Sequence, residues 1–143
     1  MANLFESVQL GSFLRANSVF MPPLTLNRAD ADGAPRELAA TYYSQRASAG
    51  LIVTEATQIS PKGKGYFNTP GIHSAEQVRA WSLIVESVHK SGGRIFLQLW
   101  HVGRISHTSL LPNNAQPVAP SAIRANSQTL LPRVWHRFRI LLP

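Results

Sequence analysis

Short apolar runs alternate along the chain with longer segments of mixed polarity. The runs at residues 19–21, 51–54 and 95–97 are rich in Val, Ile, Leu and Phe, and uninterrupted apolar runs of this length predict buried strands. A pattern at residues 8–14, with Gly11 near its centre, predicts a β-hairpin. The chain therefore offers three candidate core strands after an N-terminal hairpin.

The segment between the first two of these strands has the features of a helix. Pro35 stands near its beginning and Gly50 follows its end, and helices commonly have proline at the first position and glycine after the last. Leu38, Tyr42 and Ala49 fall on one face at helical spacing. We expect that face to pack on the sheet.

The segment between the second and third strands predicts a second helix. Ser74 with Gln77 three residues later is a capping-box signature, and a Ser-Gly-Gly turn at residues 91–93 marks the end. An apolar stripe at helical spacing indicates a helix that packs on a core. The residues of this stripe are Val78, Trp81, Val85 and Val88.

The resulting order of elements is strand, helix, strand, helix, strand. Right-handed crossovers make such strands parallel, so their carboxyl ends meet at one edge of the sheet. Thr25, Ala56, Gln98 and Trp100 lie at or just after these ends. Because α/β proteins build their sites at this edge, we expect these four residues to converge on a functional site.

Chain length limits the fold. A closed (β/α)8 barrel needs about 250 residues and rarely fewer than about 200, whereas this chain has 143, which is enough for one domain with a core. The pattern is equally compatible with part of a barrel and with a small doubly wound sheet. Residues 21–25 contain no G-x-G-x-x-G turn for a dinucleotide phosphate.

Five segments together resemble the Old Yellow Enzyme family of flavoproteins, in the family's order and spacing, between residues 4 and 125. These segments are residues 20–25, 42–57, 64–66, 70–73 and 98–107. They are most similar to bacterial N-ethylmaleimide reductases and xenobiotic reductases. The resemblance implies an α/β fold that is the N-terminal part of a (β/α)8 TIM barrel, truncated after about three βα units.

The same resemblance implies a function and its cofactors. Family members hold FMN at the carboxyl rim of the barrel and use NAD(P)H as the reductant. Hydride transfer from flavin N5 reduces activated alkenes, such as α,β-unsaturated carbonyls and maleimides, or nitro compounds. The expected function is that of a fragment of such an oxidoreductase (ene-reductase) acting on a small-molecule substrate.

Carried over position by position, the resemblance assigns a cofactor-binding role to five residues. Pro23, Leu24 and Thr25 are expected beside the isoalloxazine ring, where the Thr25 hydroxyl donates toward flavin O4 and tunes the reduction potential. Ala56 is expected to offer backbone groups to the flavin edge. The Gln98 amide, which is both donor and acceptor, suits the pyrimidine edge of the ring.

Tyr66 and Trp100 are expected to line the substrate pocket above the flavin. The histidine pair (or His/Asn) and the tyrosine that bind and protonate substrate in the family are expected beyond residue 143. No catalytic residue is therefore assigned within this chain, which we expect to be inactive by itself. Threonine at position 25, in a chain without cysteine, is typical of the family branch that lacks a cysteine there.

Each of these residues also has a purely structural interpretation. Trp100 is compatible with an ordinary rim or core aromatic residue. Tyr66 follows the glycine-rich residues 61–65, which could form a solvated loop and lack the spacing of a phosphate-binding loop. His101 and His107 have no partner at a metal-ligand spacing, so we expect no metal site.

The residues after 125 differ in composition from the rest. From Arg124 onward the chain has four arginines and no acidic residue, so the formal net charge of +7 falls to +3 for residues 1–123. We therefore divide the chain into a barrel portion, residues 1–125, and a basic, aperiodic tail, residues 126–143. An out-of-frame reading of GC-rich DNA produces such a tail. A basic arm for nucleic acid or membrane is the alternative, without a supporting motif.

The remaining expectations are of an enzyme fragment in the cytoplasm. The first residues show no signal-peptide pattern, and no apolar run approaches the roughly 18 residues of a membrane span. We expect neither nucleic acid nor membrane as a partner, and the oligomeric state is undetermined. Two alternatives remain for function: a non-catalytic remnant of a disrupted gene, or one chain of a split barrel.

Overall fold

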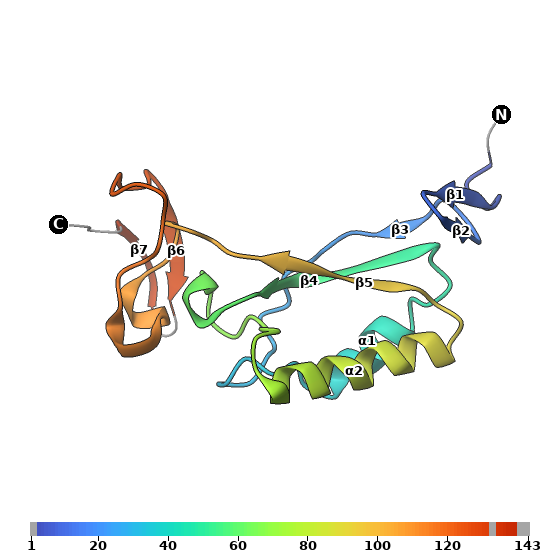
Figure 1. Ribbon diagram of the computed structural model, residues 1–143, viewed down its shortest axis with the longest axis horizontal. Helices are drawn as coiled ribbons and strands as arrows, with labels where there is room; N and C mark the ends of the chain where they lie inside the picture. Colours follow the sequence, from blue (N-terminus) through green and yellow to red (C-terminus); the bar gives the residue numbers. More distant parts are fainter. Residues whose placement is uncertain (1–2, 132–133, 140–143) are drawn as a thin grey trace.

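The computed structural model describes residues 3–131 and 134–139. Its centre is a parallel sheet of β3 (Phe20–Met21), β4 (Leu51–Gln58) and β5 (Ile95–Trp100), in the order β3-β4-β5. Figure 1 shows both helices of the described part on one face of this sheet. The sheet is open, which agrees with the expected partial barrel and not with a closed one.

Parallel pairing brings the carboxyl halves of β4 and β5 side by side. Ala56 pairs with Gln98, and Gln58 pairs with Trp100. Both strands extend beyond the apolar runs that predicted them, because ladder pairing continues through the polar residues that follow each run. Ala56, Gln98 and Trp100 therefore lie within strands and not in the loops after them.

The first helix is shorter than expected. α1 spans Leu38–Ser44, whereas the pattern predicted a helix reaching Ala49. After Ser44 the chain continues in turns, in which the N–H groups of Ala47 and Ala49 donate to carbonyls three residues earlier. These turns lead to Gly50, so the predicted end point is retained although the helix stops before it.

The buried residue of α1 also differs from the prediction. Tyr43 is fully buried, whereas Leu38 is 64% exposed; Tyr42 and Ala49 are half-buried at the edge of the core. The hydroxyl of Tyr43 accepts a hydrogen bond from the backbone N–H of Glu55 at 3.0 Å. This bond into β4 explains why Tyr43, and not Leu38, faces the sheet.

The second helix begins as predicted. α2 spans Ala75–Lys90 and opens with a complete capping box. The Ser74 hydroxyl accepts from the Gln77 N–H at 3.2 Å, and the Gln77 side chain accepts from the Ser74 N–H at 3.1 Å. This exchange satisfies two of the backbone donors that a helix start leaves unpaired.

The hydrophobic core lies between the sheet and the two helices. Val78, which was expected in it, is 46% exposed; the buried side of α2 carries Gln77 at the expected place of Val78 and Ile84 at the expected place of Val85. Val85 packs at the edge of the core. The buried members of the core cluster are Tyr43, Ile52, Trp81, Ile84, Val88 and Ile95.

Two antiparallel hairpins flank the sheet. β1 (Val8–Leu10) and β2 (Phe13–Arg15) form the predicted N-terminal hairpin, with Gly11 at a φ of +57° in its turn. β6 (Gln128–Leu131) pairs with β7 (Val134–Arg139) beyond the carboxyl ends of the parallel strands (Figure 1). The segment expected to be aperiodic therefore contains two strands, because backbone pairing does not require alternation of side chains; residues 140–143 lie outside the described part.

None of the helices in the described part of the chain is long and apolar enough to cross a membrane.

The first prediction concerns the Tyr43 hydroxyl. Tyr43→Phe leaves the buried Glu55 N–H unpaired, so we expect the free energy of unfolding to fall by about 1–3 kcal/mol. Tyr42→Phe is the matched control, because the Tyr42 hydroxyl makes no hydrogen bond within the described residues; it should cost under about 0.5 kcal/mol. Urea unfolding of both variants measures the difference, and equal losses would contradict the role assigned to Tyr43.

The same hydroxyl predicts a pH dependence. Burial raises the pKa of Tyr43 above its ordinary value, so the phenol ionises more readily in the unfolded chain. Its stabilising contribution is complete below about pH 10 and declines as the pH rises further. The free energy of unfolding of Tyr43→Phe should fall less steeply above pH 10 than that of the parent chain.

The second prediction concerns Gln77, which is 2% exposed. Its side chain accepts from the His73 and Ser74 N–H groups and donates to the Asp32 carbonyl at 2.8 Å. Gln77→Leu removes all three bonds, so the free energy of unfolding should fall by about 2–4 kcal/mol. The exposed neighbour provides the control: Glu76→Gln should cost under about 0.5 kcal/mol. A similar loss in both variants would show that Gln77 has no special role.

Candidate functional site

The carboxyl ends of β4 and β5 lie side by side on the side of the sheet nearer β6 and β7, whereas β3 pairs only with the start of β4, at Leu51 and Ile52 (Figure 1). Ala56 and Gln98 are direct register partners there, and residues 22–26 follow β3. Ala56 is 8% exposed, whereas Gln98 is half-buried. Two residues predicted from separate motifs are thus adjacent in the sheet.

The loop after β3 presents its side chains to solvent. Pro23, Leu24 and Thr25 are all exposed, with Leu24 at 51%. Hydrogen bonds begin only at the end of the loop. There the Leu26 N–H donates to Glu55 Oε2 at 3.0 Å. The three predicted residues of this loop therefore form an exposed surface whose far end is attached to β4.

A second attachment lies immediately beyond the first. The Asn27 side-chain amide donates to the Phe67 carbonyl at 2.6 Å, and the Ala29 N–H donates to the Asn68 carbonyl at 3.0 Å. Asn27 has a φ of +55°, a conformation that asparagine adopts more readily than most residues. The chain turns sharply there and joins the segment that follows Tyr66.

A register shift interrupts the pairing of β4 with β5 between Val53 and Ala56. At this shift the Thr54 hydroxyl accepts the Gln98 N–H at 3.2 Å, and the Glu55 N–H is bonded to Tyr43 of α1. Such bulges are common next to active sites, where they redirect a side chain. The position of Gln98 thus depends on a side chain of β4 and not only on the backbone ladder.

The Glu55 carboxylate is buried beside this shift, with 3% of the residue exposed. Burial raises the pKa of the Glu55 carboxyl above its ordinary value, and hydrogen bonds from the Leu26 and Asn27 amides oppose that effect. Sequence reasoning missed both Thr54 and Glu55. The available signal was two consecutive polar residues at the end of the run expected to be buried, Thr54 as its last residue and Glu55 directly after it.

Tyr66 and Trp100 are in contact. Their ring centroids are 5.5 Å apart with an angle of 41° between the planes, and both residues are half-buried. Because Trp100 ends β5 and Tyr66 comes from the loop after β4, the contact joins two different strand ends. The structure therefore brings together the two residues predicted for a substrate pocket.

The loop that carries Tyr66 is attached along its length. It begins with a 3-10 turn, Pro61–Gly63, and the Gly63 carbonyl accepts the Val102 N–H at 3.3 Å. The Lys64 carbonyl accepts the Ser106 hydroxyl. A solvated loop, the alternative interpretation of this segment, does not fit these bonds.

Glycine allows this loop to lie against the segment after β5. A Cβ atom at Gly65 would overlap the Val102 side chain, and one at Gly63 would come within 3.1 Å of His101 Cδ2. Neither glycine has a positive φ. Glycine is therefore required at these positions by the close approach of the two segments and not by the backbone conformation.

The charged and imidazole side chains after β5 have local roles. His101 Nδ1 accepts the Gly103 N–H at 3.0 Å, and His107 Nδ1 accepts the Ser109 N–H at 3.2 Å. Arg104 donates to the Ile123 carbonyl at 2.7 Å. Within the described residues, no group of three or more His, Asp or Glu side chains is placed to hold a metal ion.

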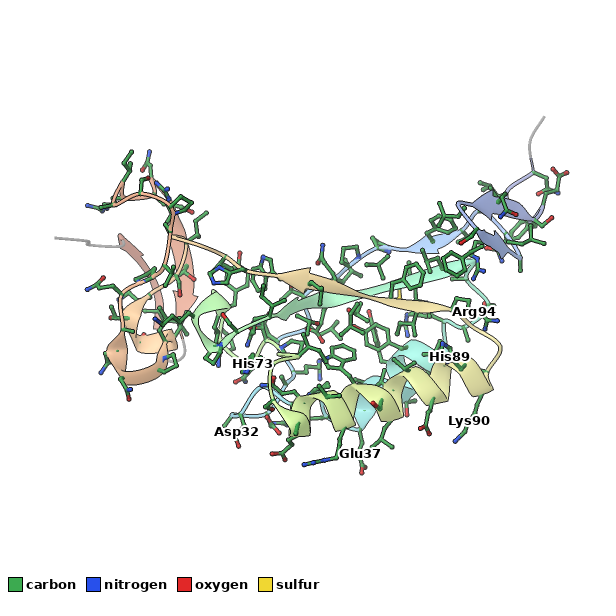
Figure 2. All side chains as sticks on the ribbon, viewed as in Figure 1. Asp32, Glu37, His73, His89, Lys90 and Arg94 are labelled. Atoms are coloured by element: carbon green, nitrogen blue, oxygen red, sulfur yellow. The ribbon has the colours of Figure 1, made fainter. Side chains whose placement is uncertain are left out.

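Two cavities of the described part lie beside β4. One of about 580 Å³ lies between α1 and residues 26–29, with Glu55 in its wall. Another, of about 280 Å³, lies near the start of α2, where Figure 2 shows Asp32 and His73. The residues predicted to bind flavin line neither cavity.

Comparison with known proteins identifies the family. The model of the NADH:flavin oxidoreductase / NADH oxidase family matches residues 3–138, a range that includes most of the segment predicted as a separate tail. The division at residue 125 therefore stays a prediction.

Curated relatives and solved structures agree with this match. 12-oxophytodienoate reductase 1 of Oryza sativa subsp. japonica is 44% identical over 117 residues, which cover 81% of this chain and 30% of that protein. Morphinone reductase in complex with tetrahydroNAD is 53% identical with a TM-score of 0.84, over 88% of this chain and 34% of that one. The old yellow enzyme homologue of Zymomonas mobilis is 48% identical with a TM-score of 0.82, over 88% and 35%.

The chain spans about a third of the length of these relatives. The resemblance to the Old Yellow Enzyme family and the partial barrel fold are confirmed, as are FMN and a nicotinamide reductant as the cofactors of the family. The 143-residue chain belongs to the NADH:flavin oxidoreductase / NADH oxidase family.

Proposed function

We propose that this chain supplies the N-terminal third of an FMN-dependent reductase that uses NAD(P)H to reduce activated alkenes, namely α,β-unsaturated carbonyls or maleimides, or nitro compounds. The observation that carries the proposal is the pairing of Ala56 with Gln98 beside the exposed loop that contains Thr25. FMN supplies the hydride in such an enzyme. The contribution of this chain is to bind and orient the flavin and to shape one wall of the substrate pocket.

The polar groups at the strand ends suit a flavin ring. The Thr25 hydroxyl and the Gln98 side-chain amide make no hydrogen bond within the described residues, and neither residue is buried. A hydroxyl donor and an amide with both donor and acceptor match the carbonyl and ring-nitrogen edges of an isoalloxazine. Pro23 and Leu24 offer apolar surface beside them, and the small side chain of Ala56 allows close approach.

Tyr66 and Trp100 are proposed as the wall of the substrate pocket. Their tilted contact presents aromatic surface beside the strand end that carries Gln98. Binding pockets for small molecules are lined mainly by apolar and aromatic side chains. The histidine pair and the tyrosine expected to act on substrate are proposed to lie outside these 143 residues.

A split barrel is the second candidate function. On β5, Phe96 is 46% exposed on one face and Leu99 is 65% exposed on the other, and apolar exposure of this kind on a sheet typically marks a surface that another element covers. A chain that carries the complementary strands would cover it. The test is to add a separate polypeptide containing the remaining two thirds of a relative to the purified chain with FMN. Flavin retained through gel filtration only in the presence of that polypeptide supports the split barrel.

The third prediction tests the proposed function with a hybrid holoenzyme, in which residues 3–138 replace the matched segment of morphinone reductase. We expect the hybrid to retain FMN through gel filtration and to oxidise NAD(P)H with 2-cyclohexenone or N-ethylmaleimide as acceptor. The isolated 143-residue chain should be colourless, because it supplies only part of the flavin contacts. A folded hybrid that binds no FMN would disprove the proposal.

The fourth prediction separates the cofactor role from the substrate role within that hybrid. Gln98→Ala leaves polar edges of the ring unpaired and should weaken FMN binding by about 1–3 kcal/mol, measured by fluorescence titration. Trp100→Ala should change the ratio of kcat/KM values for the two acceptors while flavin content stays at the parent level. The reverse pattern, with flavin lost from Trp100→Ala alone, would exchange the two assignments.

A further inference from the structure

We propose that Glu55 is a positioning residue, whose buried carboxylate holds the Leu26 amide and thereby fixes the loop that carries Thr25 relative to Ala56. Glu55 directly precedes Ala56, and Leu26 directly follows Thr25. One hydrogen bond of 3.0 Å therefore joins the neighbours of two residues to which we assign flavin contacts. The effect on flavin rests on the proposed function; the hold on the loop does not.

The loop needs an external attachment because it has little internal structure. Pro22 and Pro23 have no N–H group to donate, and Leu24 and Thr25 make no hydrogen bond within the described residues. β3 ends at Met21. Within the described residues, the next backbone group along the chain that makes a hydrogen bond is the Leu26 N–H. The position of the exposed residues between these two points depends on where that bond is anchored.

The backbone of Glu55 is itself fixed by hydrogen bonds to neighbouring side chains. The Glu55 N–H donates to the Tyr43 hydroxyl at 3.0 Å, and the Glu55 carbonyl accepts from the Thr54 and Thr57 hydroxyls at 3.0 and 2.9 Å. The register shift removes this residue from the regular ladder to β5. Its backbone is thus bonded to side chains, and its own side chain is directed to the edge of the sheet, at Leu26.

Burial of the Glu55 carboxylate is energetically unfavourable unless other groups compensate for it. It is 3% exposed, and within the described residues no Lys, Arg or His nitrogen lies within 4.0 Å of it. Arg28 and Arg36 line the neighbouring cavity without pairing with it. A buried carboxylate without an ion pair is unfavourable unless hydrogen bonds compensate, and here the compensation comes from the Leu26 and Asn27 amides.

The experiment uses the hybrid holoenzyme with four variants. Glu55→Ala removes the acceptor, whereas Glu55→Gln keeps an acceptor oxygen of nearly the same size and removes the charge. Glu86→Ala is the charge control, because Glu86 is an exposed carboxylate paired with Lys90. Ile84→Ala is the stability control, because it opens the helix-side core without touching the loop.

Two readouts distinguish positioning from general stability. Hydrogen exchange at the Leu26 amide should be about tenfold or more faster in Glu55→Ala and within about threefold of the parent in Glu55→Gln. The visible spectrum and midpoint potential of bound FMN should shift in Glu55→Ala and be largely restored in Glu55→Gln. Glu86→Ala should match the parent in both, and Ile84→Ala should lower the unfolding temperature while leaving both readouts unchanged.

Parental exchange at Leu26 in Glu55→Ala would overturn the proposal, as would the same flavin shift in Ile84→Ala. Faster exchange with an unchanged flavin spectrum and potential would overturn the link from the loop to the flavin. If the parent hybrid binds no FMN, the proposed function fails, and the exchange at Leu26 still decides whether Glu55 holds the loop.

Discussion

The arrangement of the strand ends depends on one irregularity in β4, the register shift before Ala56. There the Thr54 hydroxyl replaces a backbone partner for the N–H of Gln98, and Tyr43 of the first helix accepts the N–H of Glu55. The helix layer, the central strand and the edge of the sheet are therefore bonded to one another through two consecutive residues. A change at either residue acts on both faces of the sheet.

Close packing supplies the second constraint on this edge. Gly63 and Gly65 let residues 61–66 lie directly on the segment after β5, and the contact between Tyr66 and Trp100 depends on that approach. The absence of side chains at Gly63 and Gly65, the second directly before Tyr66, thus helps to place the two aromatic rings. Polar attachment positions the loop after β3, whereas steric fit positions the loop after β4.

Local patterns in the sequence were sufficient to predict the elements that depend on local chemistry. The capping box at Ser74 and the turn at Gly11 rest on interactions across a few residues, and the structure contains both. The burial of Tyr43 and the shift in β4 depend on a bond between residues 12 positions apart, which periodicity does not encode. The pattern of apolar runs brought Ala56 and Gln98 together, and the two are paired in the sheet, yet it placed them at or after the ends of strands that in fact continue through them.

The one-sided core has a consequence for biosynthesis. The buried members of its cluster all lie between residues 43 and 95, so the whole of this core has been synthesised once residue 95 is added, although its parallel pairing closes long separations and is intrinsically slow. On the ribosome this face can assemble while later residues are still being added. On the opposite face of β5, Phe96 is 46% exposed and contacts the ring of Phe13 in β2, but no residue of that stretch covers it. An apolar surface is thus open during translation, and the nascent chain becomes a natural client for chaperones that bind exposed strands.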